Sequence, residues 1–557
     1  MRVSVQGNAA AAAGGGVRAD ADPTAPDLGF LFHDSPAALR SFYATVERVL
    51  ADNPVNPDAP PATLRTQAVR QGRAVASAIG FFLRFKPYPM LAEVRAAGGL
   101  FQPRFGPVLV AGGDAVRQLL ERDQEFTVEP YGVEMARVMT PRHNGGFSTF
   151  ILSTDDGTLY WPDRQLLSAV CTREDASRIT QLIHDDCMRR VTGAVNAARA
   201  EGSTRLDVVQ SLARYVPVTL VHACLGAPVA PEPGSFELTA EMLEYYGDPL
   251  DDDPATALRP GDAVIPDERL MYAWIKAAFR HFFNNVEKDP AVRRDGFRAC
   301  RQLLACLLHE IAIQRRRIED GQPVADTMLT RLVHFQLGRS TPNAARPADL
   351  DPRLVTDLRI AENVMGTIVG AVAGQEEAIC RVIDSMLRLE NGEWRTEGKG
   401  GVRYGNYDEA RKLALNVVHG INEAESRSAL YLYCLEALRL QPQGEVLLRK
   451  CARDGASIAG SRPITAGTLV FASHGSAMQD VPEPDAFILD RPREHYLQYG
   501  WGRHACLGQH VSPVLIVESM IALLSLAGLR RAGPFALDAQ NLYAEAFPVQ
   551  FSDVEVA

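Results

Sequence analysis

The stretch that decides the fold is residues 499–508, which read YGWGRHACLG. It places Cys506 in a glycine-rich turn, two residues after His504 and directly before an apolar segment that is predicted to be a helix. Free backbone N–H groups and a helix N-terminus both favour a thiolate over a thiol. From the loop alone, Cys506 is a candidate catalytic nucleophile, zinc ligand or iron ligand, or else a structural cysteine. Zinc is disfavoured because no second cysteine or histidine pair has a matching spacing.

A long helical segment upstream has one face without side chains. It is predicted to start at Asp351-Pro352 and to stop near Asn391-Gly392, and at about 1.5 Å per residue it would be a rod of roughly 60 Å. Gly366, Gly370 and Gly374 are spaced by four within it, so they share a face. Three interior glycines cost roughly 3 kcal/mol relative to alanine. Either another helix packs closely against this face, or a large flat ligand lies against the backbone.

The loop and further motifs resemble the cytochrome P-450 superfamily, the thiolate-ligated haem monooxygenases. The loop is similar to the haem-binding signature aromatic-G-x-G-x-(R/H)-x-C-x-G, with Tyr499 where phenylalanine is usual. Glu436 and Arg439 match the E-x-x-R motif. Arg491, in the sequence FILDRP, falls where the family has a third, salt-bridging arginine.

Two more segments extend the resemblance over roughly residues 85–557, with all motifs in the family's order. Residues 155–172 (DDGTLYWPDRQLLSAVCT) resemble the C-helix, where Arg164 keeps the usual arginine and Tyr160 replaces the usual histidine. Arg449, five residues before Asp454, resembles the arginine that pairs with a haem propionate.

The resemblance implies a mainly α fold with a minor β component (α+β), a single large helical domain with small β-sheets. Haem b (iron protoporphyrin IX) would lie between the long central helix and the cysteine-loop helix. Cys506 would be the iron ligand, and its thiolate would push electron density toward O–O cleavage. The residues implied to contact the cofactor are Cys506, Arg164, Tyr160, Arg449, His504, Gly374, Ala373, Gly502 and Tyr499.

The implied contacts differ in kind. Arg164, Arg449 and His504 would bind the propionates through charge-assisted hydrogen bonds, and Tyr160 would add a neutral one. Glu436, Arg439 and Arg491 would form a structural ion network that supports the loop. The glycine face of the long helix would lie over the distal side of the haem, which favours the ligand explanation for that face.

The sequence departs from the family at the distal helix, which usually reads A-G-x-(D/E)-T. Here residues 373–378 read AGQEEA, so Glu376 matches the acid and Glu377 replaces the threonine that helps to deliver protons. A buried acid is costly unless it is hydrated or functional. Glu376 and Glu377 are therefore the predicted catalytic residues, with Glu377 relaying protons through water.

Three functions follow from the resemblance. The first is monooxygenation of an apolar, small or medium-sized organic molecule, with O2 and electrons from a ferredoxin- or flavodoxin-type donor. The second uses a peroxide or rearranges a hydroperoxide, because the missing threonine hydroxyl matters less when the oxygen is already reduced. The third and least favoured is haem binding without turnover. A thiol hydrolase built on Cys506 and His504 is disfavoured, because two residues apart in one loop they are poorly placed for proton transfer.

The composition limits which binding partners and which cellular compartment are expected. The 557 residues are 46% hydrophobic and 23% charged, as in soluble globular chains, and the net charge of -10 gives no basic field for nucleic acid. No run of 18 apolar residues occurs, so no transmembrane anchor is expected. Nine cysteines without a C-x-x-C pair indicate a reducing compartment, and we expect a cytoplasmic protein.

Length alone suggests three or four domains at about 150 residues each, but the motifs belong to one catalytic unit. We expect a disordered, low-complexity N-terminus over residues 1–28, a helical extension over 29–84 and a catalytic domain over 85–557. The acidic, proline-rich stretch 247–266 is either a mobile lid or a surface insertion. The substrate pocket is expected to draw on residues 140–150, 245–285 and 365–378 and on the strands after Leu440.

Overall fold

The computed structural model describes residues 41–139, 150–285, 288–387, 396–397, 402–403, 407–458, 460–539 and 542–552. The predicted disordered N-terminus lies outside the described residues, as does most of the predicted pocket segment 140–150. The chain forms two compact units. The first contains residues up to 81 together with 103–107, and the second contains residues 82–102 and everything from 108 onward.

The first unit is built on helices α2 (Phe42–Asp52) and α3 (Pro61–Phe85), the latter continuing into the second unit. The proline-rich stretch that separates them ends in Pro61, and proline is favoured at the first position of a helix. Gln71 donates from Nε2 to the carbonyl of Asn53 (2.8 Å) and so ties α3 to the end of α2. A Cβ on Gly72 would lie 3.2 Å from the backbone nitrogen of Gly106, so α3 and residues 103–107 approach closely.

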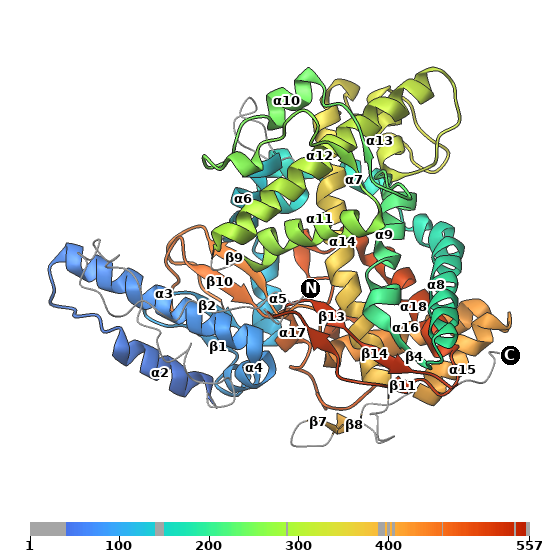
Figure 1. The fold of residues 1–557 in the computed structure, drawn as a ribbon. Coiled ribbons are helices and arrows are strands. Elements are labelled where there is room, and N and C mark those ends of the chain that lie inside the picture. Colours follow the sequence, from blue (N-terminus) through green and yellow to red (C-terminus); the bar gives the residue numbers. More distant parts are fainter. Residues whose placement is uncertain are drawn as a thin grey trace, which may run out of the picture. The chain divides into compact units, whose positions relative to one another are not determined.

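The second unit is mainly helical (Figure 1). Its α-helices are α4 (Pro87–Ala96), α5 (Gly113–Glu121), α6 (Glu129–Met139), α7 (Gly157–Val170), α8 (Glu174–Ala200), α9 (Val216–Leu220), α10 (Ala240–Tyr246), α11 (Glu268–Phe279), α12 (Pro290–Glu319), α13 (Met328–Gln336), α14 (Asp357–Met386), α15 (Tyr407–Val418), α16 (Glu423–Leu440), α17 (His474–Ala477) and α18 (Ser512–Leu524). The π-helical turns are η3 (Val209–Ala213), η4 (Val221–Leu225) and η6 (Arg280–Asn284). The 3-10 turns are η2 (Ile151–Ser153), η5 (Pro254–Thr256), η7 (Pro352–Leu354), η8 (Arg493–His495), η9 (Gly502–His504) and η10 (Leu507–His510).

The strands are short and form small sheets, as the sequence predicts. They are β1 (Leu100–Phe101), β2 (Val108–Val110), β3 (Phe126–Thr127), β4 (Arg205–Asp207), β5 (Gly234–Ser235), β6 (Val264–Ile265), β7 (Thr396–Glu397), β8 (Val402–Arg403), β9 (Leu447–Cys451), β10 (Leu469–Ala472), β11 (Arg530–Arg531), β12 (Ala536–Leu537), β13 (Ala544–Ala546) and β14 (Pro548–Gln550). The largest sheet has the order β1-β2-β10-β9-β3, in which only β2 and β10 are parallel. A second sheet has the order β11-β14-β4, and the remaining strands pair as β12-β13, β5-β6 and β7-β8.

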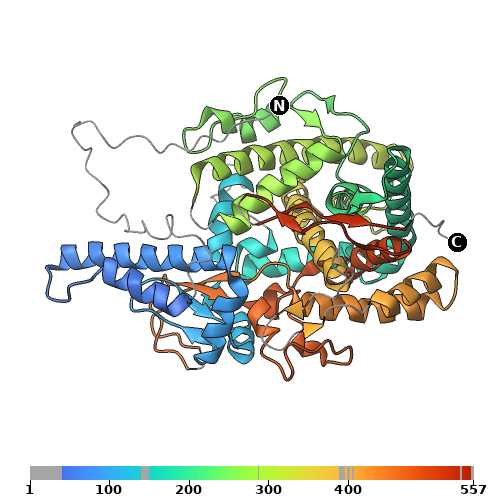
Figure 2. The ribbon, with the colours of Figure 1, turned by 60° about the horizontal axis from the view of Figure 1, so that its bottom comes forward.

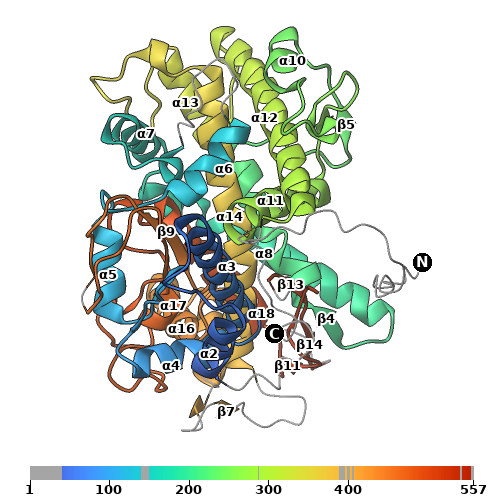
Figure 3. The ribbon, with the colours of Figure 1, turned by 90° about the vertical axis from the view of Figure 1, so that its left-hand side faces the viewer.

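Helix α14 runs through the second unit, in contact with α11, α12, α16 and α18 (Figures 1 and 3). The predicted start of this helix at Asp351 is wrong. Asp351 instead caps the separate turn η7, and α14 begins after Thr356, whose hydroxyl accepts from the backbone N–H of Arg359 (3.2 Å). Both residues are good N-caps, so sequence alone does not separate the two starts. The predicted stop near residues 391–392 is also wrong, because α14 ends at Met386 and Leu387 is already extended. The 30 residues of α14 span about 45 Å, less than the roughly 60 Å expected from the longer segment.

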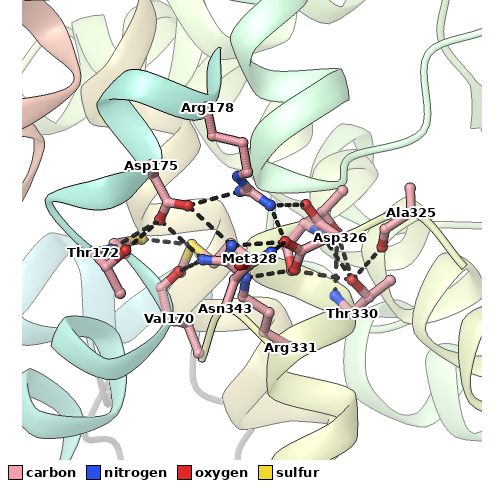
Figure 4. A network of polar contacts seen from close by, with 12 residues as sticks. Val170, Thr172, Asp175, Arg178, Ala325, Asp326, Met328, Thr330, Arg331 and Asn343 are labelled. Atoms are coloured by element: carbon pink, nitrogen blue, oxygen red, sulfur yellow. Dashed lines mark hydrogen bonds and ion pairs between the residues drawn. The ribbon is translucent and has the colours of Figure 1, made fainter. Parts of the chain in front are cut away.

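The main core lies where α8, α14, α15, α16 and α18 meet, and it is lined by aliphatic side chains. A smaller core lies beneath the largest sheet. A buried arginine also joins helices in this unit (Figure 4). Arg331 of α13 donates to both oxygens of Asp175 (2.9 Å each) at the start of α8, and to the carbonyl of Val170 (2.8 Å) at the end of α7.

Residues 247–266 lie on the outer side of α12 (Figure 2) and are anchored there. Arg301 of α12 is 4% exposed and donates from Nη1 to the carbonyls of Asp248 (2.5 Å) and Thr256 (2.8 Å). Gln302 donates to the carbonyl of Asp262 (2.9 Å). Because a buried guanidinium is costly to leave unpaired, these bonds fix the segment on α12. The surface insertion is therefore favoured over the mobile lid. Among the described helices, none has both the length and the apolar composition needed to cross a membrane.

Candidate active site

The cysteine loop is closed by a hydrogen bond from the backbone N–H of Cys506 to the carbonyl of Tyr499 (2.8 Å). Gly500 and Gly502 have φ values of 71° and 72°, in the left-handed region that favours glycine. A Cβ on Gly502 would lie 2.5 Å from the carbonyl oxygen of Leu120 in α5. Two backbone requirements therefore account for Gly502, the turn itself and the close approach of α5, and its predicted cofactor contact stays a prediction.

The thiol of Cys506 is accessible, and its sulfur accepts a hydrogen bond from the backbone N–H of Gly508. Loss of hydration raises the pKa of this thiol, and the Gly508 N–H and the charge of Arg164 offset the rise only in part. Coordination to a metal ion would deprotonate the sulfur outright.

Two arginines near the loop have donors that suit an anionic ligand. The Nη1 atom of Arg164, on α7, is buried and has no hydrogen-bond partner within the described part of the chain. Arg449, on β9, is 3% exposed, and its Nη1 donates to the neighbouring carbonyl of Leu448 (2.8 Å). A buried guanidinium with an unused donor is costly unless an anion completes it. The unpaired donor of Arg164 therefore fits an anionic group such as a haem propionate, whereas the propionate contact of Arg449 stays a prediction.

His504 and Tyr160 differ from their predicted roles. The Nε2 atom of His504 lies 2.7 Å from Oδ1 of Asp155, and burial lowers the pKa of the ring, which Asp155 offsets only in part. A neutral ring beside a carboxylate carries its proton on Nε2, so Nδ1 has no proton to donate to a propionate. The Tyr160 hydroxyl donates to the carbonyl of Arg503 (2.5 Å), so its proton supports the loop instead of a propionate.

Asp155 is a site residue that sequence reasoning missed. Its Oδ2 accepts from the backbone N–H of Val128 (2.6 Å) while Oδ1 holds His504. The neighbouring Asp156 caps α7 by accepting from the N–H of Thr158 (2.8 Å). The sequence did contain a signal, the pair Asp155-Asp156 before a predicted helix. Only one of the two carboxylates can cap the helix, so the other is free to bind elsewhere.

The three residues of the predicted ion network lie together in the interior. Arg439 donates from Nε and Nη2 to the two oxygens of Glu436 (2.9 Å each), and Arg491 donates from Nε to Oε1 (3.0 Å). Glu436 and Arg439 are both 0% exposed. Tyr496, which sequence reasoning missed, donates its hydroxyl to the second oxygen of Glu436 (3.1 Å). The network therefore fastens α16 to the segment that leads into the cysteine loop.

The glycine face of α14 serves two purposes. A Cβ on Gly366 would lie 2.4 Å from the ring of Phe150, so this glycine permits close packing of an aromatic side chain. Around the corresponding positions of Gly370 and Gly374 no other heavy atom of the described chain lies within 4 Å. Ala373 adds only a methyl group to this surface and is 4% exposed. The open part of the face fits a flat ligand, whereas Gly366 belongs to the packing explanation.

Glu376 is buried at 1% exposure and points away from the open face. It accepts from the Tyr272 hydroxyl on both oxygens (3.0 and 2.8 Å) and from Nε of Arg214 (3.2 Å). Burial raises the pKa of this carboxyl, and Lys276, Tyr272 and Arg214 offset the rise. Tyr272 is one of the aromatic residues of α11 that the sequence assigned to the core, and its polar role was missed.

Glu377 is in a different environment from its neighbour. Its Oε1 accepts from Nε (2.8 Å) and Nη2 (2.5 Å) of Arg381, one turn further along α14. The pair keeps 17% of each side chain accessible. The carboxylate that replaces threonine is therefore held as an ion pair, so it is not a free proton relay.

In sequence, no protein-family model matches the chain. It is 22% identical over 480 residues to the cytochrome P450 monooxygenase PikC of Streptomyces venezuelae, an alignment that covers 83% of this chain and 87% of PikC. A segment of 67 residues is 46% identical to linoleate diol synthase of Gaeumannomyces graminis. That match covers 12% of this chain and 6% of the synthase, so it represents a small part of that relative.

In structure, the chain has the fold of solved cytochrome P450 enzymes. The complex of P450BioI with an acyl carrier protein ligated to hexadec-9Z-enoic acid matches with a TM-score of 0.58 and 16% identity, over 85% of this chain and 100% of that one. Cytochrome P450 CYP109Q5 from Chondromyces apiculatus matches with a TM-score of 0.55 and 14% identity, over 86% of this chain and 97% of that one.

Proposed function

Because the chain has the fold of cytochrome P450 enzymes, we propose that it belongs to the cytochrome P-450 superfamily and is a haem-thiolate monooxygenase, an oxidoreductase that uses O2 to oxidise a small or medium-sized organic molecule. The observation that carries this proposal is the connection of the cysteine loop to α14, the helix that carries the open glycine face. Ser512 joins the two, since its hydroxyl accepts from Nε2 of Gln375 (2.6 Å) and from the Tyr499 hydroxyl (3.1 Å).

Haem b is the proposed cofactor. Cys506 would ligate the iron, Arg164 and Arg449 would bind the propionates, and Gly370 and Gly374 would leave room on the distal side. When bound, the group supplies the electron transfer and oxygen activation that no amino-acid side chain provides. Tyr160, His504 and Gly502 would act through the loop that they support.

Glu376 is proposed to hold and pass on the protons that the reaction consumes. Burial raises the pKa of its carboxyl, so it keeps a proton at a higher pH than an exposed glutamate would. Arg214 connects this carboxyl to the outside, because its Nη1 donates to the exposed side chain of Gln210 (2.9 Å). The hydroxyl of Tyr272 fixes the orientation of the carboxyl.

An electron donor of the ferredoxin or flavodoxin type is proposed for this reaction, since monooxygenation needs two electrons from outside the chain. A cytoplasmic location is also proposed, on the odd number of cysteines. All nine cysteines are unpaired in the structure, which is compatible with a reducing compartment.

Peroxide or hydroperoxide chemistry is the second candidate, and two observations favour it. The ion pair between Glu377 and Arg381 occupies the position of the threonine that serves proton delivery. A 67-residue segment is 46% identical to linoleate diol synthase, although it covers little of either protein. In this case the substrate would bring the reduced oxygen itself, and no electron donor would be needed.

The deciding measurement is the difference spectrum of the reduced holoprotein with carbon monoxide. We expect the red-shifted Soret band of thiolate ligation, and we expect Cys506→Ser to lose it. Cys171→Ser, at the half-buried cysteine that ends α7, is the matched control and should retain the band. An unshifted band in the unaltered protein would overturn the proposal.

Turnover then separates the two candidates. Substrate is supplied either with a ferredoxin, its reductase and O2, or with hydrogen peroxide or an organic hydroperoxide alone. Turnover that requires the electron donor supports monooxygenation, whereas turnover with peroxide alone supports the second candidate.

A further inference from the structure

A group of charged and polar side chains continues the open face of α14. Glu377 and Arg381 follow Gly370 and Gly374 at helical spacing, so all four share one side of the helix. Arg381 also donates from Nη1 to the hydroxyl of Tyr88 in α4 (3.3 Å). Because Tyr88 is 40% exposed, this group extends from the glycine face to the surface of the unit.

Glu445 completes the group, which we call the distal cluster (Glu377, Arg381, Tyr88 and Glu445). It lies in the link between α16 and β9 and interacts electrostatically with Arg381. Two residues further on, at the start of β9, a side-chain carbon of Leu447 lies 3.8 Å from the Cβ position of Gly500, so the strand that follows this link packs on the cysteine loop. The Oε2 atom of Glu445 is buried and has no hydrogen-bond partner among the described residues.

The Arg381 guanidinium has donors to spare. It carries five N–H groups, of which two bind Glu377 and one binds Tyr88. The two that remain belong to the terminal nitrogens, Nη1 and Nη2. These nitrogens form the end of the fork, which can hold a carboxylate by two parallel hydrogen bonds.

Glu445 is suited to donate to the same anion. Loss of hydration raises the pKa of its carboxyl to about 8, and Arg381, Tyr88 and Arg95 lower it only in part. The carboxyl is therefore mostly neutral at pH 7, with a proton available to an acceptor. The charged and titratable groups around it are Arg381 and Glu377 from α14, Tyr88 and Arg95 from α4, and the buried His474 of α17, whose lowered pKa of about 4 leaves it neutral.

We propose that the distal cluster is a carboxylate-binding subsite, in which Arg381 and Glu445 hold the carboxylate of an amphipathic organic acid. The apolar body of the acid lies along the face of Gly370 and Gly374, where the proposed reaction takes place. From Arg381 the helix rises about 10 Å to Gly374 and about 16 Å to Gly370, so the acid has an elongated body. This inference rests on the proposed function only for the position of the reacting carbon.

The test is equilibrium binding of three ligands that share one chain length: dodecanoic acid, methyl dodecanoate and dodecan-1-ol. Binding to the holoprotein is measured by calorimetry, and by the Soret shift in parallel. We expect the acid to bind at least about tenfold more tightly than the ester or the alcohol. Equal affinity for the three ligands would overturn the proposal.

Variants locate the effect. Arg381→Gln is expected to weaken acid binding about 10- to 100-fold, the size of losing a bidentate charged contact, and to leave ester binding unchanged. Because that variant leaves Glu377 unpaired, the double variant Glu377→Gln/Arg381→Gln provides a form without the stranded charge. The matched control is Arg48→Gln, which breaks a similar i,i+4 ion pair, with Asp52, on the exposed side of α2. This variant should bind the acid as tightly as the unaltered protein does. Acid binding that survives in both Arg381 variants would contradict the subsite.

A pH series tests Glu445 separately. The neutral carboxyl favours an anionic ligand and the ionised one repels it, so affinity for the acid should fall as pH rises through about 8. Glu445→Gln keeps a donor that cannot ionise, so its affinity should stay level from pH 7 to 9. A fall of the same size in both proteins would exclude Glu445. The carbon monoxide spectrum is recorded on the same samples. If the red-shifted band is absent but the protein still prefers the acid, the proposed function is wrong and the carboxylate subsite is still supported.

Discussion

Glu376 and Glu377 are neighbours in the sequence but lie in separate environments. Successive residues on a helix are about 100° apart, so the first carboxylate turns toward α11 and the second follows the open face. Glu376 binds Tyr272 and Arg214, whereas Glu377 binds Arg381. The two contacts support the proposed proton transfer by the acid of the distal motif, whereas its neighbour is neutralised by an arginine.

The pH profile of the proposed reaction should depend on Tyr272. Its hydroxyl bond stabilises the ionised form of Glu376, so Tyr272→Phe raises the pKa of a carboxyl that burial has already raised. Hydrogen bonds to charged groups contribute about 1.5 to 3 kcal/mol, or roughly one to two pH units. We expect the limb of the turnover profile that reports Glu376 to move to higher pH by that amount.

The matched control for this shift is Tyr245→Phe, which removes a similar hydroxyl bond to Glu241 at an exposed part of α10. An unmoved limb in Tyr272→Phe, or an equal movement in both variants, would remove Glu376 from the proton path.

At the scale of the element, α14 combines two kinds of glycine on one face. Gly366 is required by the ring of Phe150, whereas Gly370 and Gly374 border space that no described side chain fills. The identical spacing in the sequence hides this difference, because Phe150 comes from a distant segment. Among the described residues, the part of this face around Gly370 and Gly374 is the part left open, and it is the part proposed to receive a cofactor or substrate.

Alanine substitutions on this face should have opposite effects on the stability of the cofactor-free protein. Gly366→Ala drives a methyl group into Phe150, and we expect a loss of about 1 to 3 kcal/mol in the free energy of unfolding. Gly370→Ala meets no atom of the chain and improves helix propensity, so a gain of about 0.5 to 1 kcal/mol is expected. Urea unfolding measures both, and a loss at Gly370 as large as that at Gly366 would contradict this division of the face.

At the scale of the whole molecule, the second unit is held together by buried charges as well as by its apolar core. Arg331 connects α7, α8 and α13, and Glu436 connects α16 to the segment before the cysteine loop. Each guanidinium is paired with carboxylates and carbonyls, so its desolvation is compensated. The position of the loop therefore depends on contacts far from Cys506.

Removing one member of the second network should show this dependence. Arg491→Ala leaves Glu436 with one arginine fewer in the interior, and breaking such a buried pair costs about 3 to 5 kcal/mol. We expect a lower unfolding midpoint and weaker haem retention, measured by denaturant titration and by transfer of haem to apomyoglobin. Arg493→Ala, two residues away and exposed, is the control and should change neither quantity.

The domain boundaries remain a prediction at this scale. The sequence places the helical extension at residues 29–84, and the first compact unit contains residues up to 81 with the short segment 103–107. Gly72 and Gly106 show why the division is not a simple cut in the chain, because the segment after β1 returns to pack on α3.

The sequence by itself predicted the mainly helical fold, the cysteine of the loop and the residues of the Glu436 network, through its resemblance to the cytochrome P-450 superfamily. These follow from local spacing, because motifs such as E-x-x-R and the glycine-rich loop fix residue types and positions within a few residues. The tertiary structure decided the roles of Tyr160, His504, Gly366 and Glu377. Each of these residues takes its role from a partner far away in the chain or on a neighbouring helix turn: Arg503, Asp155, Phe150 and Arg381. A hydrogen-bond donor can bind only one acceptor at a time, and a space the size of a methyl group can hold only one side chain. Tertiary packing decides which partner comes within reach.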